Sequence, residues 1–388
     1  MPFTDEELIK IRRELHQIPE IGMEEFKTQA YLLEKIKEMT QNVQNIDIRT
    51  WKTAILVKVK GEGTSSQKII GWRTDMDALP VTEATGLPFS SQHPGKMHAC
   101  GHDLHMTIAL GLLKKAIEDQ TPAENDLLFL FQPAEENLSG AKLLFDAGIF
   151  GEDLPDEFYA LHVNPDLAAG TIATNNHTLF AGACEVYVTF TGKGGHAAFP
   201  QDSNDMIIAA SHFITQVQSI ISRNINPLEA AVITFGTLQA GEAVNVIAKE
   251  AKLSGTIRTL TKESSQLTRK RLSEIAHGIA ASFDCQAEIQ FKQGGYLPLI
   301  NDLVLANQMM DFLKSSPLIR FEEISPLMTG EDFAYLLDKT PGVMVWLGVN
   351  SDYPLHHGQM SPDEAVIAPA VELLSQWLKS RRIEKSHL

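Results

Sequence analysis

The chain has 388 residues, of which 44% are hydrophobic and 21% are charged, a composition that fits a globular protein of about two domains. Its formal net charge of −16 argues against nucleic acids and anionic membranes as partners, because both attract clustered Lys and Arg. Three cysteines are too sparse for a disulfide framework, so we expect a reducing, cytoplasmic compartment. The charged N-terminus predicts no signal peptide, and no apolar run approaches the roughly 18 residues of a membrane span.

The first half of the chain alternates helical and strand patterns. Thr4 followed by Glu7 indicates a capping box that opens the first helix. Leu127 to Phe131 is a continuous apolar run, which is typical of a strand buried on both faces. The predicted elements are helices at about 5–18, 24–39 and 106–116 and strands at about 54–57, 68–72, 127–131 and 158–161. This alternation predicts an α/β domain.

The pattern changes near residue 183. Val186, Val188 and Phe190 alternate with polar residues, as in a strand with one solvated face. There follow a helix at about 204–222, strands at 231–238 and 246–258, a helix at 262–283 and a strand at 287–291. This β-α-β-β-α-β order predicts a small ferredoxin-like α+β domain inserted at 183–293. A helix, a strand and a helix at about 302–314, 343–347 and 365–380 complete the α/β domain, expected at 1–182 and 294–388.

The segment from Met97 to His105 concentrates side chains that bind metals. It contains Cys100, His98, His102, His105 and Asp103. Thiolates, neutral imidazoles and carboxylates are the ligands of zinc-like divalent ions. Taken alone, the C-x-H spacing of Cys100 and His102 on a turn also fits a buried thiol beside a helix-capping His.

Four other places, most of them directly after predicted strands, carry metal-competent side chains. Each alone is more often a solvated acid or a hydrogen-bonded His, but sites in open α/β sheets gather beyond the carboxyl ends of strands. Together they predict a centre for two divalent ions, with one Glu as a ligand and its neighbour as a base. The residues are Asp75 and Asp77, Glu135 and Glu136, His162, and His356.

The inserted domain adds three candidates. The Gly-rich turn at 192–200 presents His196 but lacks the G-K-[ST] ending of a phosphate-binding loop. Asn245 and Arg258 flank a predicted strand, and Arg is well suited to bidentate binding of a carboxylate. A surface ion pair is the alternative interpretation of Arg258.

These motifs, in this order, resemble the M20 metallopeptidase superfamily. The similarity runs from Leu15 to Glu364 and is strongest to the amidohydrolase subfamily, which includes hippurate hydrolases, indole-acetyl-amino-acid hydrolases and N-acetyldiaminopimelate deacetylases. Two departures are visible, since 137–139 reads Asn-Leu-Ser where members usually have glycines, and Gly358 and Met360 replace a proline and an aromatic residue. The motifs are M-H-A-C-G-H-D-x-H, Q-P-A-E-E, G-K-G-G-H-A-A-x-P, G-T-I-R and L-H.

The resemblance implies a role for each candidate. It implies a metallopeptidase-type α/β catalytic domain with an inserted lid and dimerisation domain, a homodimer, and two divalent ions (zinc, manganese, cobalt or nickel) per subunit. Glu135 matches the general base and Asp77 an acid that orients the site. His196 matches a residue that enters the partner's active site, while Asn245 and Arg258 match contacts to the substrate carboxylate. The implied metal ligands are Cys100 in the bridging place, His102, Glu136, His162 and His356.

The implied activity is hydrolysis of an N-acyl amino acid. The sequence at 103–110, 127–136 and 328–333 is most similar to that of the N-acetyldiaminopimelate deacetylase branch. That branch releases acetate and L,L-diaminopimelate from N-acetyl-L,L-diaminopimelate for lysine biosynthesis. A broader N-acyl-amino-acid or hippurate-type hydrolase is the first alternative, and a catalytically silent binding protein on the same fold is the second.

Overall fold

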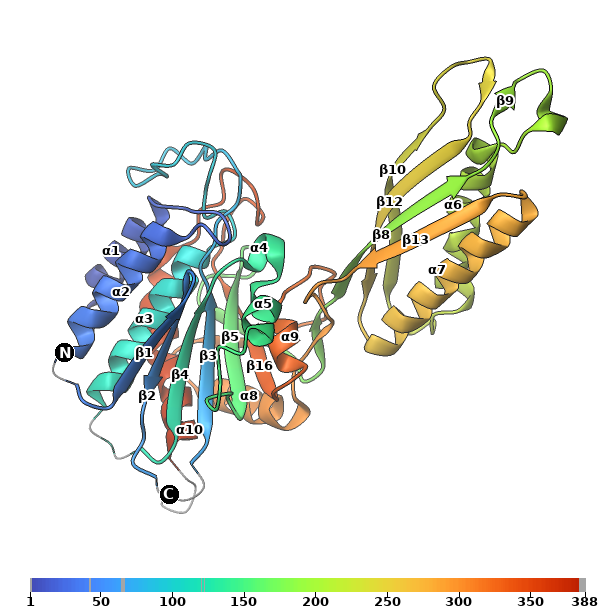
Figure 1. Ribbon diagram of the computed structural model, residues 1–388. Coiled ribbons are helices and arrows are strands. Elements are labelled where there is room, and N and C mark those ends of the chain that lie inside the picture. The colour runs from blue at the N-terminus through green and yellow to red at the C-terminus, as the bar shows by residue number, and fades with distance from the viewer. Residues whose placement is uncertain (1, 42, 64–66, 120, 122, 384–388) are drawn as a thin grey trace. The chain divides into compact units, whose positions relative to one another are not determined.

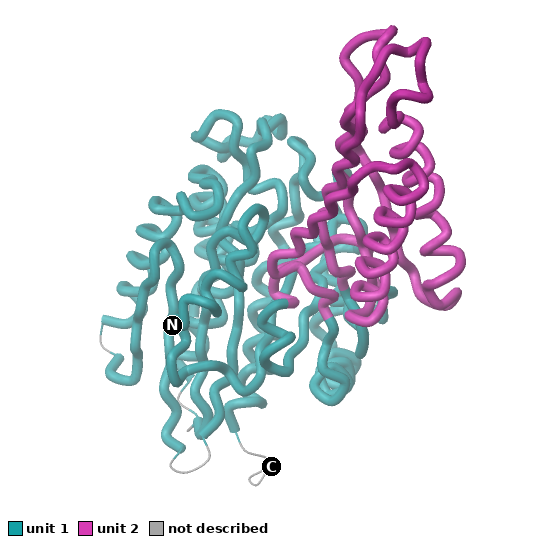
Figure 2. The backbone as a smooth tube through the Cα atoms, turned by 45° about the vertical axis from the view of Figure 1, so that its right-hand side comes forward, with its two compact units in different colours: residues 1–179, 300–325, 335–388 teal, residues 180–299, 326–334 magenta. Residues whose placement is uncertain are grey.

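A computed structural model describes residues 2–41, 43–63, 67–119, 121 and 123–383 (Figure 1). The chain divides into two compact units (Figure 2). Unit 1 comprises 1–179, 300–325 and 335–388, and unit 2 comprises 180–299 and 326–334. The predicted boundaries at 183 and 293, and the lid role of the inserted domain, stay predictions.

Unit 1 is built on an eight-stranded sheet in the order β1-β2-β4-β3-β5-β16-β6-β15. The adjacent strands β4, β3, β5 and β16 are parallel to one another, so their carboxyl ends share one edge. All seven residues of β4 and all eight of β5 are buried, as expected for strands covered on both faces. The strands are β1 (Ile46–Trp51), β2 (Ala54–Val59), β3 (Ile69–Asp75), β4 (Asp126–Gln132), β5 (Glu157–Asn164), β6 (Thr171–Thr174), β15 (Arg320–Glu323) and β16 (Gly342–Gly348), with short strands β7 (Thr178–Phe180) and β14 (Leu299–Ile300).

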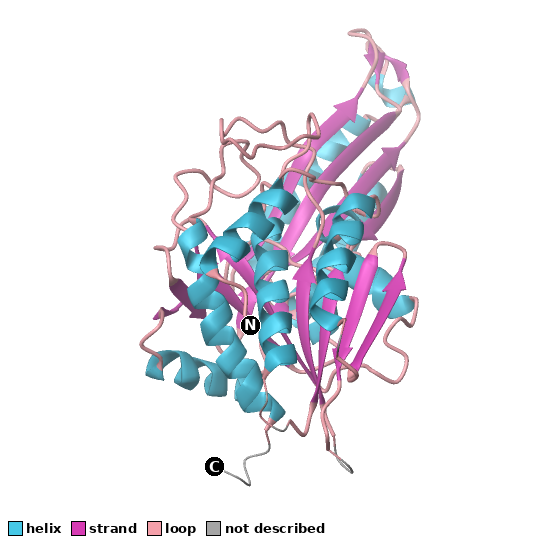
Figure 3. Cartoon of the chain, turned by 90° about the vertical axis from the view of Figure 1, so that its left-hand side faces the viewer, coloured by secondary structure: helices cyan, strands magenta, loops and turns pink. Residues whose placement is uncertain are grey.

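Helices cover the sheet of unit 1 (Figure 3). The apolar core lies between the sheet and helices α1, α2, α3, α8 and α10. The predicted capping box is present, because Thr4 Oγ1 accepts the Glu7 N–H and Glu7 Oε2 accepts the Thr4 N–H. The helices are α1 (Asp5–His16), α2 (Phe26–Thr40), α3 (His102–Glu118), α4 (Glu135–Leu138), α5 (Gly140–Asp146), α8 (Leu303–Ser315) and α10 (Ile367–Arg382), with a 3-10 turn η2 (Glu364–Val366). The short helix α9 (Phe333–Leu337) begins in unit 2 and ends in unit 1.

Unit 2 contains the predicted βαββαβ core. Its antiparallel sheet has the order β10-β12-β8-β13, which is the strand order of ferredoxin-like domains, with α6 and α7 packed on its apolar side. The elements are β8 (Gly182–Thr191), α6 (Met206–Arg223), β10 (Ala231–Ala240), β12 (Glu250–Thr259), α7 (Lys262–Ser282) and β13 (Gln286–Lys292). The strands β9 (Gly195–His196) and β11 (Val246–Ile247) form a separate two-stranded sheet. A 3-10 turn, η1 (Pro200–Asp202), comes after β9 in the chain.

Three local predictions need correction. The helix expected to begin at 106 begins at His102. Gly101 turns the chain into the helix with a left-handed φ of 81°, and the polar residues of the first helical turn are buried with partners rather than solvated. His162 lies inside β5 rather than after it. The single strand expected at 246–258 is two strands, β11 and β12.

Among the described helices, none has both the length and the apolar character needed to cross a membrane. A cytoplasmic location stays a prediction.

Candidate metal centre

The five predicted ligands come together in unit 1, on segments that meet at the carboxyl ends of the parallel strands. Gly101 lets the start of α3 approach β5, since a Cβ there would lie 2.5 Å from Val163 Cγ2. Cys100 therefore sits in the turn before α3, and His102 is the first residue of that helix.

Cys100, His102 and His162 form one potential metal-binding group, with ligand atoms all within 4.8 Å of one another. Cys100 Sγ lies 3.4 Å from His162 Nε2. His162 Nδ1 donates to the Val163 carbonyl over 2.8 Å, and His102 Nδ1 donates to the Asp77 carbonyl over 2.9 Å. Each ring therefore directs Nε2 rather than Nδ1 toward the group, and a neutral ring can offer the Nε2 lone pair to a metal, which is the usual way that a backbone carbonyl orients a ligand His.

Cys100, Glu136 and His356 form a second group of the same size. His356 Nε2 lies 3.4 Å from both Cys100 Sγ and Glu136 Oε1. His356 has a left-handed φ of 66°, an uncommon conformation for a side-chain-bearing residue that clusters at functional sites. Cys100 belongs to both groups, and its predicted bridging role stays a prediction.

Orphaned polar atoms and excess negative charge both fit cations at these groups. His102 Nε2 and Glu136 Oε1 are buried 3.8 Å apart, and neither has a hydrogen-bond partner among the described residues. Burial opposes protonation of His102, yet Asp75, Asp77 and Glu136 raise its pKa to about 10. Burial, with Glu136 nearby, raises the pKa of the Cys100 thiol well above its usual range, so a thiolate there calls for a neighbouring cation.

The predicted base and ligand, Glu135 and Glu136, begin the short helix α4 rather than extending β4. Asp77 accepts the N–H of Glu135 at Oδ1 over 3.1 Å and that of Glu136 at Oδ2 over 2.9 Å. Glu135 is buried, and its carboxylate lies within 4.8 Å of the ligand atoms of His102 and Glu136. Ser139 closes the turn with a left-handed φ of 56°, where the family's glycine would be unstrained.

A buried chain of hydrogen bonds lies behind the ligands, and the sequence motifs do not predict it. Gln132 Oε1 accepts from Arg73 Nε over 2.9 Å, and Arg73 Nη1 contacts Asp75 Oδ2 over 2.7 Å. Asp75 Oδ1 lies 2.6 Å from His105 Nδ1, and His105 Nε2 accepts the Val163 N–H over 2.9 Å. Both nitrogens of His105 and both carboxylate oxygens of Asp75, which were candidates from their residue types, thus have protein partners.

In unit 2, His196 and Asn245 are neighbours, and both are exposed. His196 pairs with Val246 across the β9–β11 ladder, and the Asn245 carbonyl accepts the Ala197 N–H over 3.0 Å. His196 Nδ1 accepts the Ala198 N–H over 3.1 Å, so the neutral ring presents an Nε2–H donor.

Arg258 lies elsewhere in unit 2, near the end of β12 that pairs with Ala183. It is half-buried, burial lowers its pKa, and no carboxylate among the described residues pairs with it. The alternative interpretation of Arg258 as part of a surface ion pair therefore finds no partner in the described part of the chain, and its contact with a substrate carboxylate stays a prediction.

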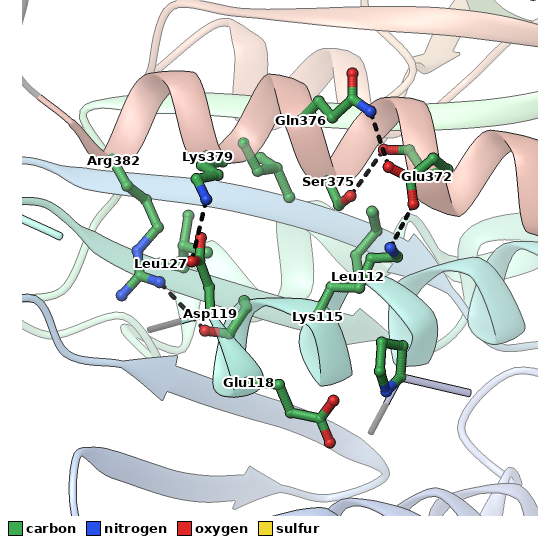
Figure 4. Close-up of a pocket in the computed structure, with 13 residues that line it drawn as sticks. Leu112, Lys115, Glu118, Asp119, Leu127, Glu372, Ser375, Gln376, Lys379 and Arg382 are labelled. Atoms are coloured by element: carbon green, nitrogen blue, oxygen red, sulfur yellow. Dashed lines mark hydrogen bonds and ion pairs between the residues drawn. The ribbon is translucent and has the colours of Figure 1, made fainter. Parts of the chain in front are cut away.

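A cavity of about 360 Å³ lies between α3 and α10 (Figure 4). Two of its lysines are paired with acids, Lys115 with Glu372 and Lys379 with Asp119, and Arg382 donates to the backbone carbonyls of Asn125 and Ala116. Lys115 lies about 20 Å along α3 from His102 at a rise of 1.5 Å per residue, so this cavity is separate from the metal centre. The remaining lining includes Leu112, Ala116, Leu127, Ser375, Leu378 and Arg382.

Comparison with known proteins identifies the class. A model of peptidase family M20/M25/M40 matches residues 71–380, and the chain belongs to this family. The predicted resemblance and the predicted α/β fold class are confirmed.

Individual relatives of the chain have more specific names than the family. The N-acetyldiaminopimelate deacetylase of Streptococcus pneumoniae (strain Taiwan19F-14) is 58% identical over 378 residues, 97% of this chain and 100% of that protein. The same enzyme from S. pneumoniae strain 70585 is 57% identical over the same share of both chains. A dinuclear metal binding peptidase of the M20 family from Bacillus subtilis is 30% identical, with a TM-score of 0.85 over 97% of this chain and 98% of that one.

Proposed function

We propose that this chain removes the acetyl group from N-acetyl-L,L-diaminopimelate, giving acetate and L,L-diaminopimelate for lysine biosynthesis. The observation that carries the proposal is the convergence of five potential ligands with Glu135 beside them; His356 is exposed, Glu136 is partly buried and the other three are buried. The ligands are Cys100, His102, Glu136, His162 and His356. The 58% identity to a deacetylase of this substrate, over the full length of that protein, supports the choice of acyl amino acid.

Two divalent ions are the proposed cofactors, and both groups of ligands include Cys100. Ions bound there would polarise the amide carbonyl and make a water molecule a stronger nucleophile. Mixed thiolate, imidazole and carboxylate ligands suit zinc, manganese, cobalt or nickel.

Glu135 is the proposed general base. Its backbone is held by Asp77, and its carboxylate faces the ligand atoms of His102 and Glu136, where the attacking water must sit. Glu135 takes the proton of that water and returns it to the leaving amine. The Nε2–H of His196 is suited to donate to the developing oxyanion, and Arg258 to hold the α-carboxylate of the substrate.

We propose a homodimer in which His196 serves the partner's site. Arg258 on β12 pairs with Ala183 on β8, and Glu250 on β12 pairs with Thr191 on β8. The two pairs lie eight residues apart along the strands, which is about 26 Å at ~3.3 Å per residue. The strand β9, which contains His196, follows Thr191 and lies beyond that end of the sheet (Figure 1). One amino-acid substrate is too short to touch both side chains of one subunit.

The exposed edge of unit 2 fits such a dimer. In the described chain β10 is a ten-residue edge strand, and long edge strands pair readily with a second copy. Val232 and Leu238 on β10 and Ile207 and Ile208 on α6 are exposed apolar side chains close to that edge.

Acetate release by the wild type and by Glu135→Gln, with metal content measured for both, tests the proposal. We expect the variant to retain its metals and to lose about 10²–10⁴-fold in kcat, because only proton transfer is removed. Full activity in Glu135→Gln would exclude Glu135 as the base. Comparison of N-acetyl-L,L-diaminopimelate with N-acetyl-lysine and hippurate separates this substrate from the broader alternative, which equal or higher rates on the last two would favour.

A further inference from the structure

The turn that carries Glu135 and Glu136 has an unusual backbone. Ala134 precedes them with φ 58° and ψ 40°, a left-handed conformation that residues with a Cβ rarely adopt. The turn directs three successive N–H groups, those of residues 134–136, away from the strand ladder. All three end on buried carboxylates, two on Asp77 and one on Glu25.

Glu25 is fully buried on the loop before α2. Its Oε1 accepts the Ala134 N–H over 2.9 Å, and its Oε2 accepts the Thr53 hydroxyl over 2.7 Å. The same loop packs directly on the turn, since a Cβ on Gly22 would lie 2.7 Å from Ala134 Cα. The loop and the turn are thus fitted to each other.

We propose that Glu25 is a positioning residue for the hydrolysis: together with Asp77 it clamps the turn that aims Glu135 and Glu136. This inference rests on the proposed function. Glu25 lies 110 residues before Glu135 in the sequence and acts through the backbone, without a contact to the substrate.

The energetics favour a specific role for this carboxylate. Burial, with the charge of Asp77 nearby, raises the pKa of Glu25 to about 7, so its ionised form is costly in this place. An apolar residue would avoid that cost but would leave the Ala134 N–H buried without an acceptor. The hydrogen bond from Ala134 to Glu25 offsets the cost of the buried carboxylate, because it stabilises a left-handed backbone conformation that is otherwise unfavourable for Ala134.

Glu20 provides a matched control. It is a second buried carboxylate of the same loop, and its Oε2 accepts the N–H groups of Lys27 and Thr28 and the Thr28 hydroxyl at the start of α2. Replacing Glu20 removes a similar number of hydrogen bonds without touching the turn at 134–136.

The experiment compares Glu25→Ala, Glu25→Gln and Glu20→Ala in the full, metal-loaded chain. We expect Glu25→Ala to lower kcat about 10- to 100-fold, with KM and metal content close to wild type, because the base is displaced while the ligands remain. Glu25→Gln keeps an acceptor oxygen for the Ala134 N–H and should recover most of kcat. Glu20→Ala should lower thermal stability but not kcat.

Amide hydrogen exchange of the segment 134–140 gives a second readout that does not depend on any substrate. Glu25→Ala should lose protection there, and Glu20→Ala should not. Unchanged exchange in Glu25→Ala, or a kcat no lower than that of Glu20→Ala, would overturn the clamp. A wild type inactive on every acyl amino acid would defeat the proposed function instead, while hydrogen exchange would still decide the clamp. If Glu25→Ala does not fold, Thr53→Val, which removes only the bond that orients Glu25, takes its place with the same expected direction.

Discussion

His105 accepts the backbone N–H of Val163 at Nε2 over 2.9 Å, and this bond fixes the tautomer of the ring. Burial lowers the pKa of His105, so the neutral ring carries its single proton on Nδ1 and donates it to Asp75, 2.6 Å away. Both nitrogens are therefore used by the protein, and His105 anchors the strand that presents His162.

We predict that His105→Leu weakens metal binding about 10- to 100-fold without abolishing it, as is typical when a residue that supports metal ligands is lost. Calorimetric titration of metal-free protein with a single metal measures this directly. His177→Ala, which alters an exposed His of the same unit, is the control. Wild-type affinity in His105→Leu would show that the bond to Val163 does not position His162.

The pKa of His102 predicts how the metal-free protein responds to pH. Its folded pKa of about 10 lies above the ordinary value of 6.5, so protonation stabilises the folded state. That stability is fully present below about pH 6.5 and is lost as the pH rises toward 10. We expect the urea midpoint of metal-free protein to fall between pH 6.5 and 9.

Metal-loaded protein and His102→Gln are the two comparisons for this titration. A bound cation replaces the proton among the carboxylates, so the fall should disappear when metal is in excess. It should also shrink in His102→Gln, which removes the titrating group. A midpoint that is flat or rises with pH in the metal-free wild type would contradict the assignment.

The sequence could predict the fold class and could name the residues that meet at the strand ends. Both follow from local patterns: an apolar run such as Leu127 to Phe131 defines a buried strand, and ligands such as Cys100 and His102 stand in short, recognisable spacings. The residues that support the ligands and the base could not be predicted, because they act through hydrogen bonds from backbone N–H groups, and these bonds leave no pattern in a sequence. Glu25 and Ala134, or His105 and Val163, become partners only when distant segments fold together.

Arg258 should set substrate affinity rather than the rate of the chemical step. It is half-buried without a carboxylate partner among the described residues, so its guanidinium can receive the substrate carboxylate in both the ground state and the transition state. We expect Arg258→Met to raise KM roughly 10- to 100-fold with little change in kcat. Arg223→Met, at an exposed Arg at the end of α6, is the control. A drop in kcat with KM unchanged would place Arg258 outside the ground-state contact.

A site made by one subunit and a site shared between two subunits respond differently when two inactive variants are mixed. His196→Ala and Arg258→Met should each be nearly inactive at low substrate concentration as homodimers. If His196 serves the partner's site, a mixed dimer has one intact site, which takes Arg258 from the His196→Ala subunit and His196 from the other. Random exchange of equal amounts makes half of the dimers mixed, so the mixture should recover about a quarter of wild-type activity. If both side chains act within one subunit, no combination restores a site and the mixture stays as inactive as its components. We expect recovery, because Arg258 and the end of β12 near His196 lie about 26 Å apart within one subunit. The measurement is acetate release after the two variants are mixed and allowed to exchange subunits.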